Sequence, residues 1–145
     1  KHSRRLSDRQ RILALDLGEK RIGVAVSDAL NIIAQSVGRI DMQNLKSDFK
    51  NIEGFIKEYG AGRLVVGLPL NMNGTQGKSA NLAIDFVNKL KREIHIEVEM
   101  VDERLTTAQG ERVFLEADMS REKRKKNLDK IAAQLILQNY LDSHV

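Results

Sequence analysis

The stretch RILALDLGEKRIGVAVS, residues 11–27, contains two short apolar segments separated by a turn. In the first predicted strand, residues 11–18, four consecutive apolar residues lead directly to Asp16. In the second, residues 21–27, larger apolar residues alternate with smaller ones, which is typical of a strand. Because only the short turn at residues 18–20 joins the two, we expect a β-hairpin and therefore an antiparallel start to the fold.

The rest of the chain alternates between predicted strands and helices. Residues 44–59 carry apolar side chains at spacings of three and four, which predicts a helix, and glycines 60 and 62 end it. Further strands are expected at residues 34–40, 64–68 and 96–101, and further helices after a capping Ser79, at 105–117 and at 124–141. An antiparallel start followed by strand–helix alternation predicts an α/β fold with a mixed sheet and helices on both faces.

Composition and length limit the class of protein. The chain has 145 residues, 41% of them hydrophobic, which suits one domain with a real core. We expect residues 1–10 to be flexible or derived from cloning, and residues 11–145 to form that single domain. The absence of cysteine favours a location in the reducing cytoplasm. The sequence shows neither a signal peptide nor an apolar run of about 20 residues, so we expect no membrane association. The net charge of +4 is compatible with a polyanionic partner.

Two acidic motifs lie at the ends of predicted strands. Asp16 follows apolar residues, where a carboxylate loses hydration unless a partner compensates, and a metal ion or a cap of the Gly18 turn would explain it equally well. Asp102 and Glu103 close the strand at 96–101, and because side chains alternate along a strand, one of them faces the site. Asp102 is the better type of residue to cap a following helix, which leaves Glu103 without a structural explanation.

The third acidic position, Asp129, lies on the last predicted helix. It precedes Ala132, Ala133 and Ile136 by three, four and seven residues, so it lies on or beside the face that packs inward. A nearby lysine is one possible partner for this carboxylate and a metal ion is another. We favour the metal ion once the other two acidic positions are considered with it.

Three carboxylates from two strand ends and a helix suit Mg²⁺ or Mn²⁺, which prefer oxygen ligands. Two such ions about 4 Å apart can activate a water and stabilise the leaving oxygen of a phosphodiester. The three histidines have no zinc-like spacing. The residues therefore favour a hydrolase, a metal-dependent nuclease, with Asp16, Asp129 and one of the pair Asp102 and Glu103 as its catalytic and metal-binding residues.

Basic residues flank each acidic motif. The run 121–126 leads into the helix of Asp129, where its cations could hold a phosphate backbone, although such a run is often only a solvated face. Aromatic residues make up 4% of the chain, so we expect salt-sensitive binding to backbone and shape rather than base stacking. The expected nucleic-acid-binding residues are Lys20, Arg21, Asn73, Lys78, Arg104, Arg121, Arg124, Lys125 and Lys126.

Two ATP-binding alternatives are disfavoured. The loop at residues 67–79 ends in Gly77-Lys78-Ser79, but a P-loop needs a further glycine at position 72, which is a methionine. Actin-like and sugar-kinase ATPases also open with Asp-Leu-Gly followed by Gly-Val-Ala. They need a second such domain to enclose the nucleotide, which 145 residues do not supply.

Taken together, the motifs resemble the YqgF/RuvX family of ribonuclease H-like proteins, described as Holliday junction resolvases and as nucleases of pre-16S ribosomal RNA. The resemblance extends from Arg11 to about Asp142, and the set in this order is more specific than any single motif. Its pieces are Leu15-Asp16-Leu17-Gly18, Arg21-Ile22-Gly23-Val24-Ala25, Ser27-Asp28, Gly67-Leu68-Pro69-Leu70 with Asn73-Gly74, Asp102-Glu103-Arg104-Leu105-Thr106-Thr107, and Lys125-Lys126 through Asp129 to Ala132-Ala133.

The resemblance implies a five-stranded mixed sheet with surrounding helices. It also implies that Asp16, Glu103 and Asp129 are the catalytic acids, with Asp102 as the second choice beside Glu103. Arg104 and Thr107 would lie next to the site, and the loop at 67–74 beside the substrate.

The function expected from these observations is endonucleolytic processing of the 5′ end of pre-16S ribosomal RNA. The main alternative is a Holliday junction resolvase acting on branched DNA, which would have to be a homodimer because junction cleavage needs two symmetric sites. The sequence does not decide between a monomer and a homodimer. An alternative of another class is a nucleic-acid binding module without catalysis.

Overall fold

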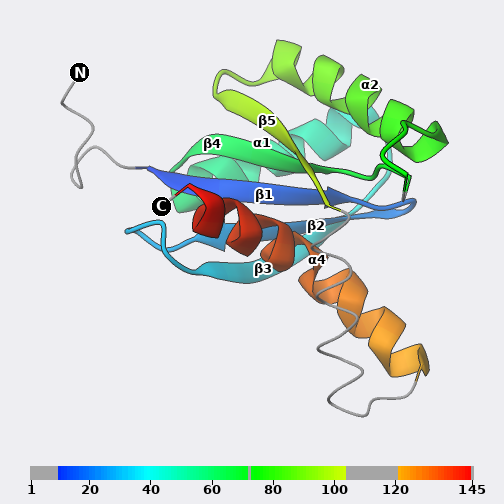
Figure 1. The fold of residues 1–145 in the computed structure, drawn as a ribbon. Helices are drawn as coiled ribbons and strands as arrows, with labels where there is room; N and C mark the ends of the chain where they lie inside the picture. Colours follow the sequence, from blue (N-terminus) through cyan, green and yellow to red (C-terminus); the bar gives the residue numbers. More distant parts are fainter. Residues whose placement is uncertain (1–9, 72, 104–120, 145) are drawn as a thin grey trace.

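The computed structural model describes residues 10–71, 73–103 and 121–144 (Figure 1). For residues 121–130 it describes the backbone alone. Five strands form one sheet in the order β3-β2-β1-β4-β5. The described elements are β1 (Arg11–Leu17), β2 (Arg21–Ser27), β3 (Ala34–Asp41), α1 (Leu45–Tyr59), β4 (Ala61–Leu68), α2 (Lys78–Glu93), β5 (Glu97–Asp102) and α4 (Arg121–Ser143).

The predicted hairpin is confirmed. β1 pairs antiparallel with β2, and Gly18 N donates to the Arg21 carbonyl at 2.8 Å to close the turn between them. β2 pairs antiparallel with β3, whereas β1–β4 and β4–β5 are parallel. The sheet is therefore mixed, as the residue pattern predicts, and β1 separates its antiparallel half from its parallel half.

Helices cover both faces of this sheet, which confirms the expected α/β architecture (Figure 1). On one face α1 and α2 bury a core with the sheet, in which Phe49 and Phe86 meet edge to face with ring centroids 5.2 Å apart. On the other face α4 packs through Ala133, Ile136 and Leu137. The first part of α4 extends beyond the sheet, so its second half provides this cover.

Local capping explains where α1 begins and ends. Asn44 is the N-cap, and its side chain accepts a hydrogen bond from Ser47 N at 2.9 Å. Gly60 ends the helix in the left-handed conformation, with φ 63°, and its N–H reaches the carbonyls of the last turn. The helix predicted at residues 44–59 is thus confirmed to within one residue.

Several predicted boundaries differ from the structure. β4 begins at Ala61 rather than 64, because its pairing with β1 extends the strand through Gly62, a residue that the sequence pattern assigns to the end of the helix. Ser79 does not cap α2: the N-cap is Gly77, which makes no side-chain cap bond. β5 is shifted by one residue, to Glu97–Asp102, and α4 is longer than the predicted 124–141. The helix predicted at 105–117 lies outside the described residues.

Gln10, the first residue described, already contacts the domain, because its carbonyl accepts a hydrogen bond from the Asn31 side chain at 3.2 Å. Within the ranges that the structure describes, no helix is both long and apolar enough to cross a membrane.

Candidate active site

Asp16 lies near the carboxyl end of β1, in the middle of the sheet. It is in register with Gly23 of β2, and its neighbour Leu15 is in register with Val66 of β4. Side chains alternate along a strand, and Ala14 belongs to the core beneath α4. Asp16 therefore lies on the α4 face of the sheet, just beyond the apolar packing, and is partly buried.

Glu103 follows β5 directly and lies on the same face. Val101 packs against the core beneath α4, and Glu103 is two residues further on. Its backbone N–H donates to the Leu68 carbonyl at 3.4 Å, which keeps it close to the end of β4. Its carboxylate lies against Gly67, so closely that a Cβ at Gly67 would collide with it and would also lie 2.6 Å from Ile136 Cδ1.

The electrostatics of Glu103 show that the acids lie close together. The pKa of Glu103 is raised from 4.5 to about 7, mainly by burial and in addition by the negative charges of Asp16 and Asp102. Asp102 is exposed, whereas Glu103 is partly buried. Of the two adjacent acids, Glu103 is thus the one that faces inward beside Asp16.

Asp129 is in α4, but its side chain lies outside the described residues. The backbone still gives its place along the sheet. Tyr140 of α4 reaches Arg63, and Ile136 lies at Gly67, so α4 runs antiparallel to β4. Asp129 precedes Ile136 by seven residues, about 10 Å along the helix axis, and therefore lies beyond Gly67, toward the carboxyl end of β4.

The predicted basic residues that the structure describes follow β1 and β4 in the chain. Lys20 and Arg21 are exposed and follow β1, the strand of Asp16. Asn73 is exposed in the connection after β4, where its Oδ1 accepts hydrogen bonds from Thr75 N and Oγ1 at 3.1 and 2.7 Å, and Lys78 is exposed at the first position of α2. Arg104 and the side chains of Arg121, Arg124, Lys125 and Lys126 lie outside the described residues.

The donors present fit a divalent cation. Asp16 and Glu103 offer hard carboxylate oxygens on one face of the sheet. The pKa of Glu103 is raised by burial and by repulsion from Asp16 and Asp102, and a cation bound between the acids would relieve that repulsion. Among the side chains that the structure describes, no group of three potential ligands is present. The third predicted ligand, Asp129, is not among them.

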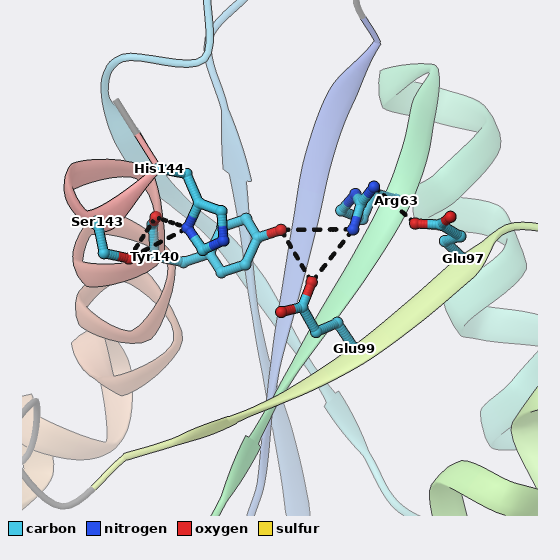
Figure 2. Close-up of polar contacts among 6 residues, drawn as sticks. All are labelled: Arg63, Glu97, Glu99, Tyr140, Ser143 and His144. Carbon is cyan, nitrogen blue, oxygen red and sulfur yellow. Dashed lines mark hydrogen bonds and ion pairs between the residues drawn. The ribbon is translucent and has the colours of Figure 1, made fainter.

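A polar network missed by sequence reasoning links α4 to the sheet further along the same face (Figure 2). Tyr140 Oη donates to Glu99 Oε1 at 3.0 Å, and Arg63 Nη1 donates to the same oxygen at 3.1 Å. The other end of the guanidinium pairs with Glu97 at 2.6 Å. Burial and the hydrogen bond to Glu99 raise the pKa of the Tyr140 hydroxyl. The sequence signal that could have indicated this network is the presence of two charged residues, Glu97 and Glu99, in the predicted strand region that became β5.

Comparison with known proteins gives the family of the chain. Residues 10–143 match the model of the family RuvX, described as "Holliday junction resolvase". The chain belongs to the RuvX family. A relative from Natranaerobius thermophilus is 50% identical over 135 residues, which are 93% of this chain and 96% of that protein. One from Clostridium tetani is 51% identical over 133 residues, 92% and 96% of the two chains. Both carry the name "Putative pre-16S rRNA nuclease".

Solved structures support the fold of this RuvX protein. The fowlpox virus Holliday junction resolvase superimposes with a TM-score of 0.53 at 16% identity, covering 92% of this chain and 99% of the viral one. RuvC of T. thermophilus in complex with a Holliday junction gives 0.50 at 13% identity, covering 94% and 96%. At these identities the likeness shows a shared RuvC-like, ribonuclease H-like fold.

Proposed function

We propose that this RuvX protein is a metal-dependent endonuclease that hydrolyses phosphodiester bonds in structured RNA and processes the 5′ end of pre-16S ribosomal RNA. The observation that carries the proposal is the inward-facing Glu103 carboxylate beside Asp16, with its pKa raised to about 7. A carboxylic acid with a perturbed pKa at the carboxyl ends of the strands of a sheet is typical of a functional site. The names of the relatives support the choice of RNA substrate.

The chain's own residues would divide the work. Asp16, Glu103 and Asp129 would hold the ions, and Mg²⁺ or Mn²⁺, when bound as a pair, supplies activation of a water and stabilisation of the leaving oxygen. Gly67 leaves the room that the Glu103 carboxylate and Ile136 Cδ1 occupy, because a Cβ at this position would collide with both. This packing would fix the direction of the carboxylate and limit the access of bulk water to it.

The exposed cations near the site would position the substrate rather than react with it. Lys20, Arg21 and Lys78 would bind backbone phosphates, together with Asn73, Arg104 and the basic run of residues 121–126. Binding through such contacts should weaken steeply with salt. Action on ribosomal RNA would also place the protein in the cytoplasm, the compartment that the lack of cysteine favours.

A Holliday junction resolvase is the second candidate, favoured by the description of the matching family. It requires a homodimer with two symmetric sites, whereas cleavage of pre-16S RNA does not. A non-catalytic binding module is a third reading, in which the loss of Asp16 would have no effect on any reaction.

The deciding experiment compares cleavage of pre-16S RNA and of a four-way DNA junction, each with Mg²⁺ or Mn²⁺. We expect the RNA to be cut, and Asp16→Asn to abolish cleavage while retaining most of the binding. Asp85→Asn, which changes an exposed carboxylate on α2, is the matched control and should cleave normally. Unchanged cleavage by Asp16→Asn would refute the assignment, and cleavage of the junction alone would favour the resolvase.

A further inference from the structure

A groove of about 490 Å³ lies between the edge strand β3 and α1. Its walls carry cations, carboxylates, amides and one aromatic ring. The residues on which the argument rests are Arg39, Asp41, Lys50, Asn51, Phe55 and Glu58. None of them belongs to the acidic site or to the basic residues predicted from the sequence.

The β3 side of the groove lies two strands away from the acidic site. Asp16 is in register with Gly23 of β2, and Gly23 is in register with Arg39 of β3. Neighbouring strands are about 4.8 Å apart, so the backbone of Arg39 lies roughly 10 Å from that of Asp16 across the sheet. Because α1 covers the face opposite to Asp16, a nucleic-acid strand that is cut at Asp16 would cross β3, meet Arg39, and turn round the edge of the sheet to reach the α1 side of the groove.

The chemistry of the groove suits a single nucleic-acid strand. Arg39 and Lys50 are exposed cations, which bind backbone phosphates. The partly buried Phe55 ring stacks on Tyr59 with an interplanar angle of 8°, and it lies beside Gly38 of β3, where a Cβ would be 3.6 Å from its Cζ. Phosphate contacts combined with an aromatic surface are the usual means of binding an unpaired strand.

Asp41 moderates the charge of this surface. One of its oxygens lies 3.8 Å from Arg21 Nε and 3.9 Å from Arg39 Nε, and all three side chains are more than half exposed. Ion pairs of this length and exposure contribute little to stability. The two arginines can therefore exchange Asp41 for a phosphate at small cost. Glu58 is the second carboxylate of the groove, and both acids oppose the binding of an anion.

We propose that the groove between β3 and α1 binds a single-stranded RNA segment flanking the bond that is cut. Arg39 and Lys50 hold two of its phosphates, and Phe55 contacts a base. The inference rests on the proposed nuclease function, because it assigns the groove to the same substrate. It adds a binding site that lies outside the acidic centre and gives the enzyme a preference for substrates with an unpaired extension.

The test measures binding in the Asp16→Asn protein, which does not cut its ligand. The probes are a labelled RNA hairpin and the same hairpin with a uridine extension of about ten nucleotides, a typical length for a single-strand site, at either the 5′ or the 3′ end. We expect one extension to increase affinity, and the double variant Arg39→Ala/Lys50→Ala to lose that increase while it binds the plain hairpin as before. Lys91→Ala, an exposed lysine of α2, should behave like the parent.

Salt gives a quantitative readout. With a slope of about −0.7 per phosphate on a single strand, two lost contacts change the slope by about 1.4, so the affinity lost between about 50 and 200 mM salt becomes about 7-fold smaller. Asp41→Asn should act in the opposite direction and tighten binding of the extended probe. Because Asp41 is exposed, this variant also tests the groove without removing a buried group.

The outcomes separate the two proposals. If neither extension adds affinity, or if Lys91→Ala loses as much as the double variant, the groove does not bind RNA. Weaker binding by Asp41→Asn would also overturn the inference. If the single-stranded extension increases affinity but the unmodified protein cuts no RNA, the nuclease proposal fails while the groove remains an RNA-binding site.

Discussion

Replacing Glu103 by glutamine is expected to stabilise the metal-free protein. The pKa of Glu103 rises from 4.5 to about 7 on folding, first through burial and then through the charges of Asp16 and Asp102. Each tenfold change in proton affinity corresponds to 1.36 kcal/mol, so the ionised carboxylate destabilises the fold by about 3 kcal/mol at pH 8. Glutamine keeps the size of the side chain and removes the charge.

The effect should depend on pH with a definite sign. Above pH 7 the carboxylate is ionised in both the folded and the unfolded chain, and its full cost is present. As the pH falls from 7 toward 4.5, the folded protein binds the proton first, so the stability of the parent rises. The advantage of Glu103→Gln should therefore be about 3 kcal/mol at pH 8 and vanish near pH 4.5.

Urea unfolding followed by circular dichroism, with EDTA present, measures this difference across the pH range. Asp102→Asn is the control, because its exposed charge is the smallest of the three causes and its effect should be smaller. Added Mg²⁺ should stabilise the parent and not Glu103→Gln, since binding to the folded state alone raises stability. A Glu103→Gln protein that is less stable at pH 8, or whose advantage is the same at every pH, would refute the reasoning.

Three further substitutions test other parts of the structure. Gly67→Ala places a methyl group against both the Glu103 carboxylate and Ile136, so we expect a loss of about 1–3 kcal/mol in thermal unfolding together with slower RNA cleavage; an unchanged melting temperature would contradict the tight packing. Tyr140→Phe removes the hydroxyl bound to Glu99 while Arg63 still satisfies that carboxylate, so urea unfolding should show a loss of about 1 kcal/mol, and a loss several times larger would mean that the hydroxyl does more than this bond. Asn44→Ala removes the N-cap of α1 and should lower stability by about 1 kcal/mol, while Asn44→Ser should restore most of it.

The architecture was largely predictable because its signals are local. The short turn at residues 18–20 requires an antiparallel pair, and the apolar run from Leu64 to Leu68 fits a strand buried on both faces. The start of β4 was missed because Gly62 also ends helices, and only its pairing with β1 extends the strand. The cap of α2 was missed for a similar reason, since Ser79 has the right chemistry but the helix begins before it.

The site was predictable in part. The inward direction of Glu103 follows from alternation along β5, once the structure fixes where that strand ends. Its closeness to Gly67 depends on packing between β4, β5 and α4, which no short motif encodes. The Tyr140–Glu99 bond joins residues 41 positions apart, and local pattern carries no information about such a contact.

The place of α4 in the chain has a consequence for biosynthesis. All five strands and the helices of the opposite face leave the ribosome before α4 does. Until α4 docks, Ala14, Ala25 and Val65 present an uncovered apolar surface, which makes the nascent protein prone to association. Asp129 arrives on this same helix. Under the proposed function, a growing chain can therefore assemble the sheet without cutting RNA, and the nuclease becomes active only when α4 closes the fold.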